Sequence, residues 1–156
     1  MATIRLPSDF KEFLRLLKEH EVRYLLIGAY AVNYHGYIRA TGDMDIWIAI
    51  HPDNAQKMVK VLKKFGFEND PDIKPELFLQ EKKIIRMGVP PVRLEISTSI
   101  SGVKFEECYK ARIVDILDGV EVNLIDFENL KKNKKASGRP KDITDFKKLQ
   151  QKKTGR

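Results

Sequence analysis

The chain has only one cysteine, three histidines and no long hydrophobic run, and each of these shortages excludes a class of protein. One cysteine, Cys108, cannot form an internal disulfide, which favours a reducing compartment. The apolar runs are too short for a transmembrane helix, and the first residues lack the apolar stretch of a secretory signal. No cluster of cysteine and histidine suggests a zinc site. We therefore expect a cytoplasmic protein with no membrane partner.

The positive charge of the chain is concentrated at one end. Residues 1–130 contain 18 Lys/Arg and 20 Asp/Glu, a net charge of −2, whereas residues 131–156 contain 11 and 2, a net charge of +9. The sum is the +7 of the whole chain. A basic segment of this kind either contacts phosphates, nucleic acid or an acidic partner, or forms a solvated helix with a lysine tail.

The apolar periodicity predicts one α+β domain over residues 1–156, which is long enough to bury its own core. Helices are expected at 8–20, 29–34, 52–66, 105–109, 127–136 and 141–151, and strands at 23–27, 44–50, 83–88, 92–98, 113–117 and 120–124. Turns are predicted at Pro90-Pro91 and Asp118-Gly119, a loop at 68–82, basic C-terminal helices within 127–151 and a flexible tail at 152–156. Because the later strands follow one another directly, we expect a mixed β-sheet with helices packed on it.

Asp43 and Asp45 form the strongest candidate site in the sequence. Side chains alternate along a strand, so both carboxylates share one face while Met44 and Ile46 share the other. Their Cα atoms would lie roughly 6.6 Å apart, so that the carboxylates can converge on a pair of divalent cations. Oxygen ligands favour Mg²⁺ or Mn²⁺. The alternative is that both residues occupy the solvated face of an edge strand, although aspartate is depleted in strands.

Glu95 is the candidate for a third carboxylate. It lies in the alternating run 92–97, where it shares with Arg93 the face opposite the apolar residues. It is the only acidic residue in a strongly alternating run after Asp45. The alternative is a surface glutamate paired with Arg93 or with a cross-strand lysine.

A glycine turn followed by an aspartate pair resembles the DNA polymerase β-type nucleotidyltransferase superfamily, in which a third acid comes from a later strand. The two segments read Ile27-Gly28-Ala29 and, after a helix ending in His35-Gly36, Arg39-Ala40-Thr41-Gly42-Asp43-Met44-Asp45. The Arg-x-Thr before the aspartates resembles small bacterial and archaeal nucleotidyltransferases of defence and toxin–antitoxin systems. So does the later segment Lys134-Lys135-Ala136-Ser137-Gly138-Arg139-Pro140-Lys141-Asp142. The resemblance covers residues 22–50, 92–98 and 124–149, and it implies a polymerase β palm-like fold.

The resemblance implies a metal-dependent enzyme that moves a nucleotidyl group from a nucleoside triphosphate such as ATP to a hydroxyl acceptor. The acceptor would be a protein, an RNA or a small molecule. Asp43, Asp45 and Glu95 would be the catalytic and metal-binding residues, with Mg²⁺ or Mn²⁺ as the cofactor. Gly28 would let the backbone approach a phosphate, to which the amides of Ala29 and Tyr30 would donate. The family often has a hydroxyl residue at the position of Ala29.

Basic residues complete the predicted nucleotide-binding set. Arg39 would reach a phosphate or brace the aspartate-bearing strand, and the alternative is an ion pair with a surface acid. Lys134, Arg139 and Lys141 cluster at the break between the last two helices, an arrangement that suits triphosphate or nucleic-acid phosphates. The lysines after Leu149 are expected to serve solvation only.

Two other function classes stay open on the sequence. Ala29 and the lack of a separate substrate-recognition domain are compatible with a non-catalytic nucleotide-binding or antitoxin-like module, which would bind a small helical toxin partner. The basic residues 131–156 are compatible with a nucleic-acid-binding adaptor.

Overall fold

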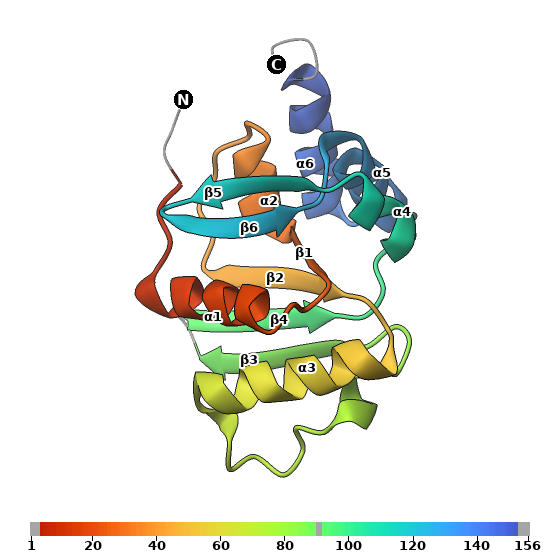
Figure 1. Cartoon of the computed structure of the whole chain (residues 1–156). Helices are drawn as coiled ribbons and strands as arrows, with labels where there is room; N and C mark the ends of the chain where they lie inside the picture. The colour runs from red at the N-terminus through yellow and green to blue at the C-terminus, as the bar shows by residue number, and fades with distance from the viewer. Residues whose placement is uncertain (1–3, 90–91, 153–156) are drawn as a thin grey trace.

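The computed structural model describes residues 4–89 and 92–152, and its elements follow the predicted order (Figure 1). In chain order they are α1 (Ser8–Glu19), β1 (Tyr24–Ile27), α2 (Gly28–Tyr34), β2 (Asp43–Ile48), α3 (Pro52–Leu62), β3 (Ile84–Val89), β4 (Val92–Ser97), α4 (Phe105–Lys110), β5 (Ile113–Leu117), β6 (Val120–Leu124), α5 (Phe127–Ser137) and α6 (Pro140–Lys152). The turn predicted at Pro90-Pro91 and positions 153–156 of the predicted tail lie outside the described residues.

The strands form one mixed sheet, as predicted, and their order in it is β3-β4-β2-β1-β6-β5. β1 pairs with β2, β3 with β4 and β5 with β6 in antiparallel fashion, while β1–β6 and β2–β4 are parallel. β2 therefore lies between β1 and β4 in the interior of the sheet, and the alternative that placed Asp43 and Asp45 on an edge strand is wrong.

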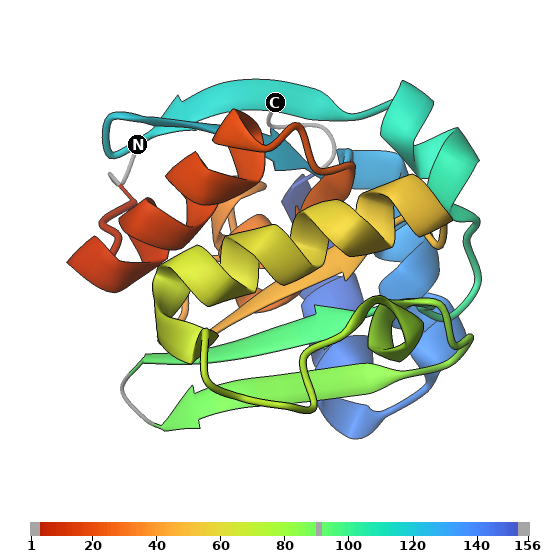
Figure 2. The same ribbon diagram turned by 60° about the horizontal axis from the view of Figure 1, so that its bottom comes forward.

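Helices cover both faces of this sheet. α1 and α3 lie side by side on one face, and α5 and α6 lie on the other (Figures 1 and 2). The apolar face of α1 contributes four fully buried side chains to the core on the α1–α3 side of the sheet: Phe10, Phe13, Leu14 and Leu17. Residues of β1 are buried on both faces, which explains why that strand reads as a continuous apolar run.

Two elements, α3 and β2, differ by more than one residue at a boundary from the sequence-based expectation. α3 ends at Leu62, and the chain then makes a wider turn over Lys63–Phe67, where Gly66 has a φ of 124° that favours glycine. β2 begins one residue earlier than predicted, at Asp43, and ends at Ile48. The loop expected at 68–82 holds one short 3₁₀ helix, Pro75–Phe78. Among the residues that the structure describes, no helix is long and apolar enough to cross a membrane.

Candidate active site

A cavity of about 960 Å³ opens between the β2–β4 part of the sheet and the junction of α5 with α6. Its walls also include Gly28 at the start of α2, the loop 39–42 and the segment 99–101. Every site residue predicted from the sequence lines this cavity except Tyr30. Residues that lie far apart in the chain thus meet at one place, and the cavity has a size typical of small-molecule sites.

The parallel pairing of β2 with β4 brings the three predicted carboxylates to one wall. Asp45 is the register partner of Glu95, and Asp43 is the partner of Arg93. Neighbouring strands lie about 4.8 Å apart, so Asp45 and Glu95 are direct neighbours across the sheet. Asp43 follows on the same face of β2, two residues before Asp45.

Asp45 is the most constrained of the three. Its Oδ1 atom is buried and has no hydrogen-bond partner within residues 4–89 and 92–152. Burial first, and then the charges of Glu95 and Asp43, raise the pKa of Asp45 to about 6. A Cβ atom added at Gly28, whose φ is +69°, would lie only 2.1 Å from Asp45 Oδ2. The carboxylate therefore packs directly against the glycine turn, and only glycine leaves room for it.

Two arginines hold the other two carboxylates. Arg93 Nη2 lies 2.7 Å from Asp43 Oδ2, and Arg86 Nε on the edge strand β3 lies 3.4 Å from Glu95 Oε2. Glu95 thus pairs across the strands, as the alternative interpretation supposed, but with an arginine other than Arg93. In residues 4–89 and 92–152, no three carboxylate, imidazole or thiolate side chains surround one point as they would a bound metal ion.

The donor set nonetheless fits a hard divalent cation. All three groups are oxygen ligands, and Asp45 offers a buried oxygen without a partner. The side chains of Asp43 and Glu95 are 30% and 22% exposed and pair with surface arginines, so both can turn towards a cation. The Gly28 turn also fits this interpretation, because the missing side chain lets the Asp45 carboxylate pack against the turn.

The opposite wall contains a buried ion-pair cluster formed by α6, α5 and the loop before β2. Lys134 Nζ lies 3.0 Å from Asp142 Oδ1 and 3.2 Å from Asp145 Oδ2. Arg39 donates two hydrogen bonds to Asp145, of 3.0 and 2.9 Å. Asp142 and Asp145 are only 4% and 1% exposed, so Arg39 pairs with a buried acid and not with a surface acid.

Asp142 has a further set of donors at the helix junction. Burial raises its pKa, but hydrogen bonds from Ser137 and Lys134 outweigh burial and hold the pKa below the usual value. Arg139 Nε also lies 2.9 Å from Asp142 Oδ2, yet the Arg139 side chain is 78% exposed. Arg139 and the exposed Lys141 therefore remain open to the cavity.

The start of α2 supplies backbone groups to the same cavity. Ile27 precedes the helix in an extended conformation, and Ala29 lines the cavity behind Gly28. The ring of Tyr30 points elsewhere, packing edge-on against Phe10 at a centroid distance of 6.0 Å. The side chain of Tyr30 is therefore not part of the cavity, and phosphate binding by its backbone amide stays a prediction.

Two arginines of the site were missed by sequence reasoning. Arg86 and Arg93 were not recognised as the partners of Glu95 and Asp43. Their pairing follows from the register between β3, β4 and β2, and cross-strand register is not visible in a single sequence.

Two acids of the site were also missed. From the sequence, Asp142 was part of the segment that carries the resemblance, but neither Asp142 nor Asp145 was predicted as a site residue. One signal could have found them, because the segment 131–156 contains just these two acids beside eleven basic residues. Acids so surrounded by cations are well placed to form buried pairs.

No family model matches the chain, and no curated protein matches it by sequence. Solved structures do match. A protein from Thermotoga maritima that is named as a candidate nucleotidyltransferase has a TM-score of 0.57 and 14% identity, over 96% of this chain and 92% of that one. An antigenic nucleotidyltransferase-like protein from Paracoccidioides brasiliensis has a TM-score of 0.54 and 15% identity, over 91% of this chain and 73% of that one.

A third match is a lincosamide antibiotic adenylyltransferase solved with lincomycin bound. Its TM-score is 0.53 and its identity 19%, over 93% of this chain and 96% of that one. Each of the three matches covers at least 91% of this chain with a TM-score above 0.5. The protein therefore has the α+β fold of nucleotidyltransferase-like proteins, as the resemblance of its motifs predicted.

Proposed function

We propose that the protein is a metal-dependent nucleotidyltransferase that moves a nucleotidyl group from a nucleoside triphosphate to a hydroxyl acceptor. One observation carries the proposal. Asp45 is held under the Gly28 turn with a buried, unpartnered oxygen, beside Glu95 and Asp43 on the wall of a nucleotide-sized cavity. Burying a carboxylate in this way is costly unless a cation offsets its charge.

In this proposal Asp43, Asp45 and Glu95 hold Mg²⁺ or Mn²⁺. Bound divalent cations would neutralise the triphosphate, lower the pKa of the acceptor hydroxyl and stabilise the pyrophosphate, which leaves as the acceptor oxygen bonds to the α-phosphorus. With a pKa of about 6, Asp45 is mostly ionised at pH 7 and available as a ligand. Glu95, on the side of the edge strand β3, is our candidate for the base that takes the proton of the acceptor.

The phosphates would lie between the start of α2 and the α5–α6 junction. Gly28 admits the backbone close to a phosphate, where the amides of Ala29 and Tyr30 can donate. Arg139 and Lys141 are the exposed cations of the wall. Lys134 and Arg39 also line the cavity, but Asp142 and Asp145 hold them, so we assign them a smaller direct share of phosphate binding than Arg139 and Lys141.

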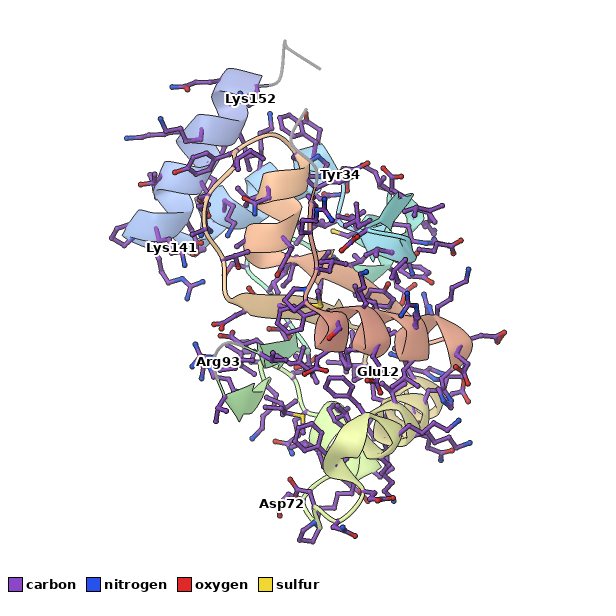
Figure 3. All side chains as sticks on the ribbon, turned by 90° about the vertical axis from the view of Figure 1, so that its left-hand side faces the viewer. Glu12, Tyr34, Asp72, Arg93, Lys141 and Lys152 are labelled. Carbon is purple, nitrogen blue, oxygen red and sulfur yellow. The ribbon has the colours of Figure 1, made fainter. Side chains whose placement is uncertain are left out.

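The test measures binding of ATP, GTP, CTP and UTP by calorimetry, with and without Mn²⁺. The variants are Asp43→Asn and Asp45→Asn. The control is Asp72→Asn, the same substitution on an exposed loop far from α6 (Figure 3). We expect at least a tenfold loss of Mn²⁺-dependent affinity in the two site variants and none in the control. Transfer of label from an α-³²P triphosphate should stop in the same two variants; equal binding and equal transfer would sink the proposal.

A non-catalytic nucleotide-binding or antitoxin-like module is the second candidate. The observation that favours it is that Arg93 and Arg86 already hold Asp43 and Glu95, while Ala29 offers no hydroxyl. This candidate predicts triphosphate binding without label transfer, and copurification with a small helical toxin partner. Ala29→Ser restores a hydroxyl at this position. If label transfer is seen in Ala29→Ser but not in the wild type, the wild-type protein is non-catalytic and the second candidate is correct.

A further inference from the structure

A line of lysines runs along the outer surface of α6 and begins at the cavity. Lys141, Lys148 and Lys152 are exposed and separated by seven and four residues, a spacing that places them on one stripe of the helix. At ~1.5 Å per residue the stripe is about 16 Å long. Figure 3 labels its two ends, with Lys141 beside the sheet and Lys152 at the far end of α6. We call these three residues the lysine stripe.

The charge of the lysine stripe is not offset by acids of its own helix. The acids of α6 are Asp142 and Asp145, and both are buried. Lys134 and Arg39 already neutralise them from the other side. The charge of the stripe is therefore not neutralised within α6 and attracts anions.

The loop that leads to the aspartate strand supports the stripe. Lys148 Nζ lies 6.0 Å from the centre of the Tyr37 ring, a cation–π distance that holds the ammonium at the surface. The side chain of Lys152 lies beside Gly36, where an added Cβ would be 3.5 Å from its Cδ atom. The stripe thus follows the segment from Gly36 towards Asp43, and Lys141 continues it into the cavity.

We propose that the lysine stripe binds the phosphate backbone of single-stranded nucleic acid and leads the end of the strand into the cavity. Regularly placed cations that track one backbone are typical of sequence-independent strand binding. A single strand is favoured because the stripe is one helix wide and a cavity of about 960 Å³ has no room for a duplex. Lys152, which the sequence favours as plain solvation, becomes part of the site.

The assignment of the strand's terminal hydroxyl as the acceptor rests on the proposed function. Binding along the stripe does not, because it needs neither Asp43 nor Asp45. Strand binding and nucleotidyl transfer can therefore be disproved independently of each other. Loss of triphosphate binding without loss of strand binding would affect the transferase alone.

The experiment measures fluorescence anisotropy of labelled 12-nucleotide oligo-U and oligo-dT between 0.05 and 0.3 M KCl. The variant is Lys148→Gln/Lys152→Gln, and the matched control is Lys60→Gln/Lys63→Gln, two exposed lysines at and just after α3 on the opposite face. Each phosphate contact contributes about −0.7 to the slope of log K against log salt, so three contacts predict about −2. The variant should lose about 1.4 of this slope and bind roughly twentyfold more weakly at 0.1 M salt.

Oligo-U and oligo-dT should bind equally, because phosphate contacts do not distinguish the sugars. Asp45→Asn should bind both oligonucleotides like the wild type. The proposal is overturned if the wild type does not bind, if the control variant loses as much affinity as the stripe variant, or if a blunt 12-base-pair duplex or anionic lipid vesicles bind as tightly as the single strands.

Discussion

The two walls of the cavity hold their carboxylates in opposite ways. On the sheet wall, Asp45 is half-buried, one of its oxygens is buried without a hydrogen-bond partner among the described residues, and burial raises its pKa to about 6. On the helix wall, Asp142 and Asp145 are more deeply buried but accept from Lys134, Arg39 and neighbouring donors. The helix wall is therefore a completed set of ion pairs, which we call the clamp, whereas the sheet wall has an acid without such partners, where we propose that a cation binds.

The clamp also explains how the sheet wall is kept in place. Arg39 belongs to the loop before β2, and Asp145 lies 106 residues later in α6. Their two hydrogen bonds tie the segment that carries Asp43 to the C-terminal helices. Substitutions on each wall test whether the helix wall stabilises the fold while the sheet wall binds a cation.

Asp145→Asn should have the strongest effect, because it leaves the cations of Arg39 and Lys134 without their shared countercharge in a buried site. We expect the free energy of unfolding to fall by about 3–5 kcal/mol, measured by urea denaturation. Glu128→Gln is the control, since Glu128 is 68% exposed in its pair with Lys131, and it should cost less than about 1 kcal/mol. A loss of the same small size in both variants would mean that Asp145 does not anchor a clamp.

Gly28→Ala should be next, because it adds backbone strain at φ +69° and overlap with Asp45. Together these should lower the free energy of unfolding by about 3 kcal/mol. Gly119→Ala separates the two causes, since Gly119 has a φ of +84° but a Cβ added there would meet no atom within 4 Å. It should cost about 1 kcal/mol in the same denaturation experiment. Equal losses would mean that Asp45 moves aside freely.

Asp45→Asn should stabilise the protein in the absence of metal. A folded-state pKa of about 6 lies above the unfolded value of 3.8, so the protonated form is favoured by folding. The stability from this group is complete below pH 4 and is lost as pH rises through 6. At pH 7 the free energy of unfolding of the neutral variant, measured by urea denaturation, should therefore be about 2 kcal/mol higher than that of the wild type. This difference should shrink towards pH 4. Asp72→Asn should show no such pH-dependent gain.

Arg93→Gln should change the free energy of unfolding least, by under about 1 kcal/mol, because the Arg93–Asp43 pair is 38% and 30% exposed. It should nevertheless raise the affinity for Mn²⁺ measured by calorimetry without nucleotide, since Asp43 is released. Lys83→Gln, which removes a half-buried cation just before β3, controls for net charge. Unchanged Mn²⁺ affinity in Arg93→Gln would show that Asp43 is not a metal ligand.

Local pattern was enough to predict most of the fold. Helical spacing in residues 8–20 and strict alternation around Asp43 and Glu95 predicted the elements and the faces of their side chains, because these periods are set by the backbone itself. The mixed sheet followed from strands that are adjacent in sequence. The order of the strands, including the interior place of β2, could not be deduced, because it depends on packing between distant segments.

The candidate site was predicted less completely for the same reason. Asp43, Asp45, Glu95 and Gly28 have short-range signals, and the structure places all four on one cavity. The partners Arg86 and Arg93 depend on strand register, and the pair Arg39–Asp145 joins segments 106 residues apart. Such contacts are set by the tertiary fold and leave no periodic trace in the sequence.

Whether a cation completes the sheet wall is decided by Mn²⁺ binding to the wild-type protein, measured by calorimetry with a non-hydrolysable triphosphate analogue from pH 7 to pH 5. We predict binding at pH 7 that weakens by up to about tenfold per unit below pH 6, as protons compete for Asp45. Asp45→Asn should abolish this binding, whereas Asp72→Asn should retain it. Equal, pH-independent Mn²⁺ affinity in the wild type and in Asp45→Asn would show that Asp45 is not a metal ligand and that the sheet wall needs no cation.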